Sequence, residues 1–99
     1  MHIEQGAILK VENVHFPLLV VSKNFFNQTG QALLCPIVKD TFEDPLHLPV
    51  DADHTCGLVM CEQIKLFDLQ YRGWEKIDQI SFRDLMNITD AIQSMFDYR

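Results

Sequence analysis

The amino-acid sequence predicts one small α+β domain that is mainly β, in which a barrel or sheet of short strands is closed by a C-terminal amphipathic helix. Short apolar runs separated by turn residues fill the first two-thirds of the chain, as in meander and barrel architectures. Near the C-terminus the apolar spacing changes to three and four, which is typical of a helix. The 99 residues leave room for one core, so residues 1–99 are expected to form a single domain.

The first two strands are expected near the N-terminus. Residues 7–12 follow Gly6 and partly alternate between apolar and polar, which favours a strand. The apolar run 18–21 comes next, and Pro17 stands at its beginning, where a strand tolerates a missing backbone N–H. Both runs have the length of short strands rather than helices.

A helical turn and a longer strand are expected next. Ser22 can act as the N-cap of a short turn over residues 23–27. A turn signal at 28–30 leads into the apolar run 32–38. Pro36 interrupts this run and implies an edge position or a bulge, because proline cannot donate to a β-ladder. Further short strands are expected at 46–50 and 58–61, which makes four or five in total.

The C-terminal helix is expected over residues 82–96. Ser81 and Asp84 form a capping box of the S-x-x-D type, with Asp in place of the preferred Glu. A single apolar stripe then follows at helical spacing, made of Leu85, Ile88, Ile92, Met95 and Phe96.

The composition limits the possible functions. Hydrophobic residues make up 47% of the chain, which suffices for a packed core, and the small size favours a homodimer that buries more surface. The formal net charge of -6 argues against a protein that wraps nucleic acid electrostatically, although it allows a small basic groove on an acidic body or a basic partner. No signal peptide or membrane-spanning segment is evident, and three cysteines indicate reduced thiols, so a cytoplasmic protein is expected.

Three possible zinc ligands lie close together in the sequence. His54, Cys56 and Cys61 lie within eight residues. Their spacing matches no usual zinc-ligand pair and no fourth ligand is evident. Cys35 and Cys61 lie in apolar runs and are expected to be core thiols. No metal and no cofactor is therefore expected.

Five strings of the sequence together resemble the motifs of one known family. The strings are Gly6–Val11, Phe16–Ser22, Asn24–Gly30, Cys35–Val38 and Gly57–Lys65. They occur in the same order as the motifs of the MazF/PemK toxins, and the chain resembles that family from Gly6 to Phe96. The second string is similar to the family's Arg-Pro-x-x-Val-[Val/Ile]-Ser strand. The fourth is similar to its [Cys/Val]-Pro-Ile-Thr strand, and the fifth to Gly-x-Val-x-x-Asp-Gln-[Ile/Val]-[Lys/Arg].

The resemblance implies a fold and a function. The fold would be the SH3-like barrel shared with the gyrase poison CcdB. The function would be that of the toxin of a type II toxin–antitoxin module, which cleaves single-stranded mRNA as a metal-independent endoribonuclease. A homodimer, an antitoxin peptide and single-stranded RNA are the implied partners. Because a fold alone does not specify a function, the site residues must be compared one by one.

The sequence departs from the family at both implied catalytic positions. Phe16 stands where the family has Arg, and Val38 stands where it has Thr. A guanidinium can clamp the reacting phosphate and a hydroxyl can orient it, whereas neither Phe nor Val donates a hydrogen bond. The loop between the first two strands is also shortened to residues 13–15. Cleavage is therefore expected to be impaired.

Neighbouring polar residues offer a relocated site. His15 is a candidate acid or base and Lys39 a candidate phosphate-binding cation. These residues equally suit exposed positions beside two strands. The expected RNA- or partner-binding residues are Lys10, Phe16, Val38, Asp40 and Gln63.

Three functions stay open from the sequence. The first is a ribonuclease toxin with the relocated site. The second is a non-catalytic homodimer that binds an antitoxin-type peptide, another protein or RNA. The third, a CcdB-like gyrase poison, is disfavoured because the chain ends in Phe96-Asp97-Tyr98-Arg99 rather than Trp-Gly-Ile.

Overall fold

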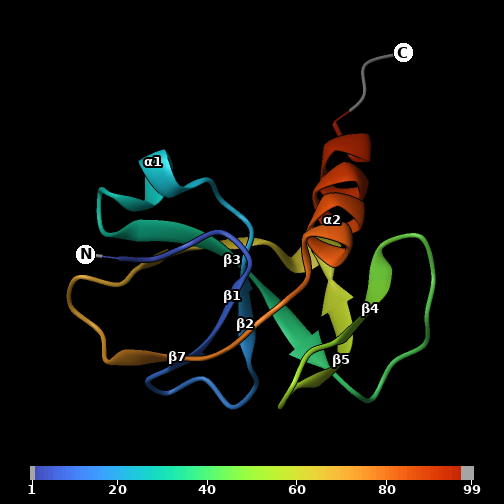
Figure 1. Ribbon diagram of the computed structural model, residues 1–99, viewed down its shortest axis with the longest axis horizontal. Helices are drawn as coiled ribbons and strands as arrows, with labels where there is room; N and C mark the ends of the chain where they lie inside the picture. The colour runs from blue at the N-terminus through green and yellow to red at the C-terminus, as the bar shows by residue number, and fades with distance from the viewer. Residues whose placement is uncertain (1, 97–99) are drawn as a thin grey trace.

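The computed structural model describes residues 2–96 and consists of one curled antiparallel sheet and two α-helices (Figure 1). The strands are β1 (Ala7–Val11), β2 (Leu18–Val20), β3 (Gln31–Val38), β4 (His47–Asp51), β5 (Cys56–Met60), β6 (Lys65–Asp68) and β7 (Trp74–Gln79). The helices are α1 (Asn24–Asn27) and α2 (Phe82–Ser94), with a 3-10 turn η1 (Cys61–Gln63).

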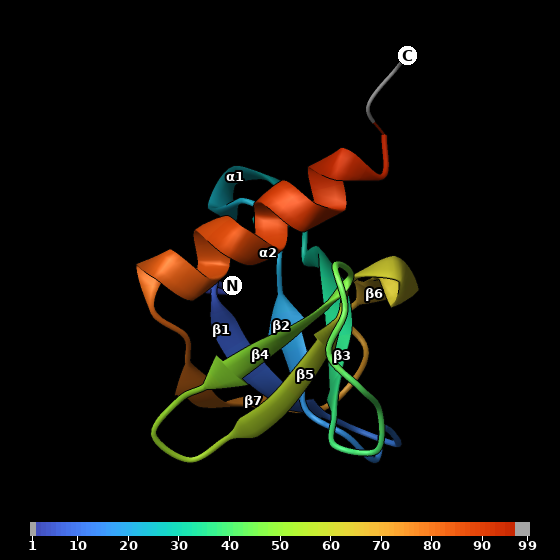
Figure 2. The same cartoon turned by 90° about the vertical axis from the view of Figure 1, so that its right-hand side faces the viewer.

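The long strand β3 pairs with three other strands of the sheet. The strand order is β4-β5-β3-β2-β1-β7, and β6 pairs with β3 outside this path. One side of β3 pairs with β2, while its other side pairs with β6 along its first half and with β5 at its end. Figure 2 shows α2 lying across the curled sheet, with β4 and β5 beside it. The expected mainly β fold closed by a terminal helix is confirmed.

Pro36 is buried near the end of this central strand, so β3 as a whole is not an edge strand, although its backbone is unpaired on one side at Pro36. The β6 side of β3 is paired up to Leu34, and the β5 side begins at Ile37. Pro36 therefore falls in the gap between two partner strands. A residue without a backbone N–H fits there, because the ladder on that side has no partner strand to receive a bond.

Two apolar clusters occupy the two faces of the sheet. The first includes Ile8, Leu19, Cys35 and Val59, and the stripe of α2 packs on it through Leu85, Ile88, Ala91 and Ile92. The second cluster is formed by the alternate residues of the same strands, whose side chains point to the other face of the sheet. Side chains from loops and strands partly cover it. Its members are Ile3, Ala7, Leu9, Val11, Leu18, Val20, Ala32, Leu34 and Leu69, with Val14, Phe67 and Trp74 packed against them.

The capping predictions had different outcomes. The Ser81 hydroxyl accepts from the Asp84 amide at 3.1 Å, as predicted for α2, although the helix ends at Ser94 rather than 96. Ser22 is not the N-cap of α1, since Lys23 holds that position without a side-chain cap. The Ser22 hydroxyl instead accepts from the Leu33 amide at 3.0 Å and donates to the buried Asn27 side chain.

The sequence patterns missed β6 and β7. Neither strand shows a run of apolar residues, because most of their side chains are exposed or half-buried. The strands are specified mainly by backbone pairing with β3 and β1. A strand that buries little of either face gives a weak periodic signal.

A histidine joins the start of β4 to η1. His47 Nε2 lies 3.0 Å from Oε2 of Glu62, and His47 Nδ1 lies 3.2 Å from Oδ2 of Asp44. The hydrogen bond with Glu62 raises the pKa of His47 above its ordinary value, and the Phe42 carbonyl and Asp44 add to this rise against the opposing effect of burial. The folded state therefore favours the protonated imidazole.

The stabilisation from His47 is expected to weaken as the pH rises. It is fully present below the unfolded pKa of about 6.5 and is lost as the pH rises through the higher folded pKa. Urea unfolding should show that His47→Gln loses more stability relative to the parent at about pH 5.5 than at about pH 8.5. His2→Gln, which changes an exposed histidine, is the control. An equal loss at both pH values would contradict this account.

Candidate functional site

Three hollows meet at the connection between β1 and β2. Their volumes are about 630, 540 and 430 Å³. His15 lines all three and Phe16 lines two of them, so this short connection separates one hollow from the next. We call them the central groove, the Trp74 hollow and the β6 groove.

The central groove is the largest of the three and contains the family's two altered positions. It is lined by residues 15–17, 37–40, 51–56 and 77. Phe16 and Pro17 come from the connection before β2, and Ile37 and Val38 come from the end of β3. The turn between β4 and β5 forms the wall facing them.

Backbone pairing places Phe16 and Val38 as neighbours across two chain segments. The antiparallel register of β2 and β3 continues beyond β2, because the Ile37 amide donates to the Pro17 carbonyl oxygen at 2.9 Å. One step further, the same register places Phe16 opposite Val38. Directly opposed residues of antiparallel strands have adjacent side chains. The two departures from the family motif therefore fall at one place.

Gly57 allows β5 to pass close under this end of β3. Its φ is 152°, and a Cβ added there would lie 2.9 Å from the Val38 carbonyl oxygen and 3.0 Å from Ile37 Cγ2. A larger residue would push the two strands apart. The glycine thus keeps β5 close to Ile37 and Val38, which line the central groove.

The charges of the central groove are mostly negative. Lys39 is the one lysine or arginine among its described lining residues, against the carboxylates of Asp40, Asp51 and Asp53. With the histidines counted as neutral, the lining carries a formal charge of -2. A phosphate entering this groove would face net repulsion.

Asp78 holds the acidic wall of the central groove in place. Its carboxylate accepts from the His54 amide at 2.7 Å, and the turn is also closed by the Ala52 amide, which donates to the Thr55 carbonyl oxygen at 2.9 Å. Burial alone would raise the pKa of Asp78, but hydrogen bonds from the amides of His54 and Gln79 and from the Thr55 hydroxyl lower it below its ordinary value.

A β-bulge directs Asp78 toward this turn. Ile8 pairs with Asp78, whereas the next residue, Leu9, pairs with Lys76. Ile77 is the extra residue on β7, and it lines the central groove. Bulges change the direction of side chains along a strand, and here the change brings a strand carboxylate to a loop from another part of the sheet.

The structure brings together five of the predicted site residues and separates the other two. The central groove is lined by His15, Phe16, Val38, Lys39 and Asp40. Lys10 lies in the Trp74 hollow, and Gln63 lies in the β6 groove.

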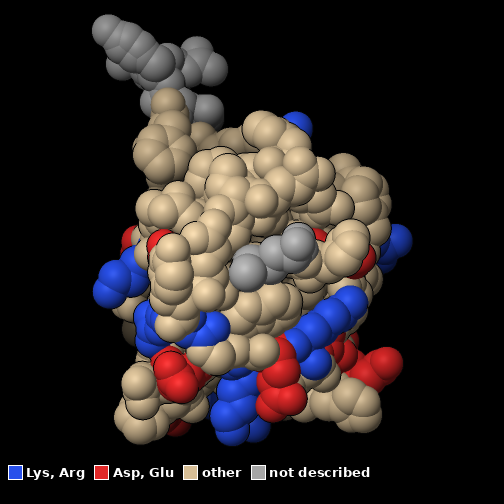
Figure 3. All heavy atoms as spheres, turned by 90° about the vertical axis from the view of Figure 1, so that its left-hand side faces the viewer, with Lys and Arg blue, Asp and Glu red and all other residues tan. Residues whose placement is uncertain are grey.

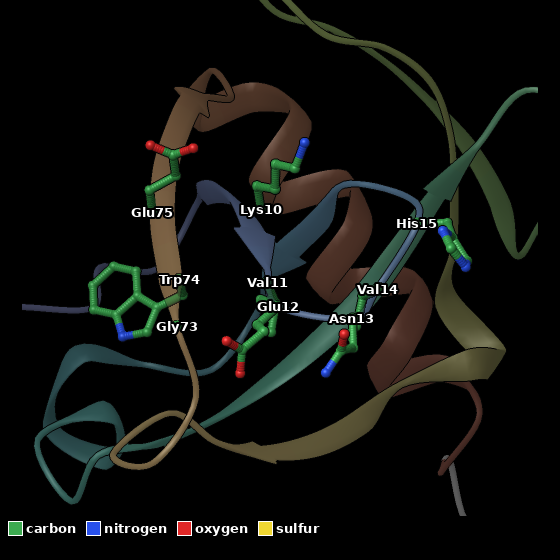
Figure 4. Close-up of a pocket in the computed structure, with 9 residues that line it drawn as sticks. All are labelled: Lys10, Val11, Glu12, Asn13, Val14, His15, Gly73, Trp74 and Glu75. Atoms are coloured by element: carbon green, nitrogen blue, oxygen red, sulfur yellow. The ribbon is translucent and has the colours of Figure 1, made fainter.

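The Trp74 hollow is shown in Figure 4 and combines residues 10–15 with 73–75. His15 lies at the opposite side of this view from Trp74, and Lys10 lies between them. Trp74, the first residue of β7, is half-buried and packs against the second apolar cluster. Glu12 and Glu75 line the same hollow, so it is not a basic site.

The β6 groove has the opposite charge to the central groove. Among the residues that the structure describes, its lining contains Lys65 and Arg72 and no carboxylate. Arg72 Nη2 donates to the Glu12 carbonyl oxygen at 2.7 Å, and its guanidinium carbon lies 5.3 Å from the centre of the Phe67 ring. The remaining lining is mainly apolar and includes Phe16.

The three candidate zinc ligands are not assembled into one site. Cys61 is buried in η1, whereas His54 and Cys56 are exposed at the central groove. Within residues 2–96, no group of three or more His, Cys, Asp or Glu is placed to hold a metal ion. In the same described range, no helix has the length and apolarity needed to cross a membrane.

The sequence reasoning missed Asp78 and the cations of the β6 groove. Asp78 gave no signal, because its role depends on a bulge and a distant turn. Lys65 and Phe67 are separated by one residue, which places their side chains on one face of β6. That spacing would have indicated the β6 groove if β6 had been predicted.

A curled antiparallel sheet with a terminal helix and a groove at the end of its central strand defines a small toxin-fold protein. Residues 11–96 match the family model of the PemK-like, MazF-like toxins of type II toxin–antitoxin systems, and the chain belongs to this family. No curated protein sequence matches the chain.

Several solved structures share the fold. A MazE–MazF structure from Deinococcus radiodurans superposes with a TM-score of 0.87 at 19% identity and covers 97% of each chain. An endoribonuclease in complex with its cognate antitoxin from a mycobacterial species gives 0.84 at 14% identity, covering 99% of this chain and 100% of that one. The Mycobacterium tuberculosis toxin MazF-mt6 gives 0.75 at 15% identity, covering 94% and 98%.

Cys56 provides a test of the wall of the central groove. It is exposed directly after the turn that Asp78 holds, whereas burial raises the pKa of Cys35 to about 12 and that of Cys61 to about 11. A thiol reagent such as DTNB should therefore modify one thiol per folded chain, because only thiolates react readily.

Asp78→Asn is expected to speed this modification, since the turn loses a charged acceptor. Asp68→Asn, which removes a carboxylate that accepts from the Gln70 amide, should leave the rate unchanged. Equal rates for the parent and Asp78→Asn would show that the carboxylate does not hold the turn.

Proposed function

We propose that this family member binds an antitoxin peptide as a toxin of its module does, but cleaves RNA far less efficiently than a member with Arg and Thr at the altered positions. The observation that carries the proposal is the position of Phe16 and Val38 together at the end of β3. Both side chains line the central groove, and neither can donate a hydrogen bond.

The chemistry of metal-independent RNA cleavage explains the expected loss. Attack of the 2′-hydroxyl on the adjacent phosphate requires removal of a proton, protonation of the leaving oxygen and stabilisation of extra negative charge. A groove with a formal charge of -2 and an apolar pair at its centre lacks that stabilisation. Loss of one such donor typically reduces the rate by a factor of about 10² to 10³.

A relocated site is the second candidate. His15 and Lys39 line the same groove and would supply a proton-transfer group and one cation. This candidate predicts metal-independent cleavage that His15→Ala abolishes. It differs from the first proposal because it requires the parent chain to cut RNA.

Antitoxin binding is supported by the relatives. The solved MazF structures include complexes with MazE, and a mycobacterial endoribonuclease is seen with its cognate antitoxin. In this chain, Phe16 is 40% exposed beside Val38, so an apolar peptide side chain could occupy the place of the phosphate clamp. We also place the protein in the cytoplasm, where its three free thiols would stay reduced.

RNA cleavage tests the main proposal. A long single-stranded RNA is incubated in excess EDTA with the parent and with Phe16→Arg/Val38→Thr. The variant is expected to cut at least about 10²-fold faster, because it regains both donors. Phe42→Arg, which adds the same charge at an exposed phenylalanine outside the central groove and outside the hollow between the helices, should not gain activity. Cleavage by the parent at the rate of the double variant would overturn the proposal, and His15→Ala would then locate the active residues.

We propose a homodimer formed through the two helices. A hollow of about 440 Å³ lies between α1 and α2, and Phe25, Phe82 and Met86 on its rim are 73%, 74% and 48% exposed. Figure 3 views the side of the molecule from which α1 projects, and the upper half of that face is almost uncharged. Exposed apolar surface of this kind favours association.

Sedimentation velocity tests this interface. The parent is expected to sediment as a dimer, and Phe82→Asp to shift it to the monomer by burying a charge against the partner. Tyr71→Asp changes another strongly exposed aromatic outside the hollow and should remain dimeric. A monomeric parent, or a Phe82→Asp variant that stays dimeric, would contradict the proposed interface.

A further inference from the structure

We propose that the acidic turn between β4 and β5 makes the central groove prefer a peptide segment that carries Lys or Arg. This inference deepens the proposed function and rests on it, because it assigns a charge to the peptide that the groove binds. Residues 40–64 contain six Asp or Glu and no Lys or Arg, and this stretch supplies residues 51–56 of the groove lining. The formal charge of -2 in the groove therefore complements a cationic partner.

Two carboxylates of the turn have no cation of their own chain beside them. Asp51 ends β4 and Asp53 follows it in the turn, and both are exposed and line the central groove. Within residues 2–96 both ion pairs involve His47, so Lys39, the cation of the same groove, pairs with neither aspartate. Carboxylates that are not neutralised by an ion pair attract an incoming cation more strongly.

Hydrogen bonds hold this turn in one conformation before a partner binds. The Asp78 carboxylate accepts from the His54 amide at 2.7 Å, and the Ala52 amide donates to the Thr55 carbonyl oxygen at 2.9 Å. Thr55 is buried beneath the turn. Because the two aspartates of the turn start from an ordered backbone, binding a cation costs less conformational entropy than it would in a disordered loop.

The rest of the groove suits the apolar stem of a Lys or Arg side chain. Phe16 is 40% exposed, Val38 and Ile77 are half-buried, and all three line the groove together with the turn. Lys and Arg pack their methylene groups against apolar surface and keep the charged end in a polar environment. The groove therefore offers both of the surfaces that such a side chain needs.

A cationic side chain fits this turn better than a metal ion does. Within residues 2–96, no group of three or more His, Cys, Asp or Glu is placed to hold a metal ion. A hard metal ion needs several oxygen ligands at about 2.0–2.6 Å, whereas an ammonium or guanidinium group can bind carboxylates that lie further apart. The occupant that we assign to the groove is therefore a peptide side chain.

Two fluorescent peptides of about 12 residues test the preference. They share the same leucines and differ only in carrying Lys or Glu at the charged positions, and their binding is followed by anisotropy at several salt concentrations. The parent is expected to bind the Lys peptide about tenfold more tightly than the Glu peptide at about 0.05 M salt. The difference should shrink at about 0.5 M salt, because salt screens exposed charges.

A pair of double variants locates the preference. Asp51→Asn/Asp53→Asn is expected to weaken binding of the Lys peptide about fivefold and not to weaken binding of the Glu peptide. The matched control is Glu4→Gln/Asp90→Asn, which removes two exposed carboxylates outside the groove and should bind both peptides as the parent does. Equal weakening by the two double variants would overturn the inference, since it would reveal a general effect of net charge.

The peptide results separate this inference from the proposed function. Equal or tighter binding of the Glu peptide by the parent would overturn the preference for a cation but leave peptide binding standing. A parent that binds neither peptide would overturn this inference and contradict the proposed peptide binding as well. The cleavage assay is separate, so neither result decides the proposed loss of catalysis.

Discussion

The pairing of β3 with three other strands is the constraint on which the rest of the structure depends. β2 covers one side of β3, while β6 and β5 share the other, and Pro36 falls where one partner gives way to the next. This arrangement curls the sheet and brings the end of β3 against the connection before β2. The same register places Phe16 opposite Val38. The two departures from the family motif are therefore far apart in sequence but close together in the central groove. A ladder with a one-residue slip would separate them.

The grooves on the two sides of Phe16 differ in charge because carboxylates are distributed unequally around them. Asp78, turned by a bulge, holds an acidic turn against the central groove. On the other side, His47 engages Glu62, and the β6 groove keeps its positive lining. An acidic protein can thus carry a locally positive groove without a positive net charge. The central groove, in contrast, is lined by three carboxylates and one lysine.

The sequence was sufficient for the parts of the fold with strong periodic or capping signals. The apolar stripe and Ser81 predicted α2 to within two residues of its end, and ordered motifs predicted the family. β6 and β7 were not predicted, because their side chains are exposed or half-buried. Of the site, Phe16, Val38, His15, Lys39 and Asp40 were predicted to matter, and the structure places them on one groove. Asp78 and Arg72 were not predictable, because their roles depend on contacts between segments distant in sequence.

The central claim is that the central groove, which is lined by Phe16 and Val38 and carries a formal charge of -2, no longer suits a phosphate. The most direct test is a backbone NMR titration with a uridine homopolymer whose 2′-hydroxyls are methylated, so that cleavage cannot occur. The account predicts that the amides of residues 38–40 and 51–56 keep their chemical shifts as the RNA is added. Amide shifts concentrated at residues 38–40 and 51–56 would contradict it and show that the central groove still receives RNA.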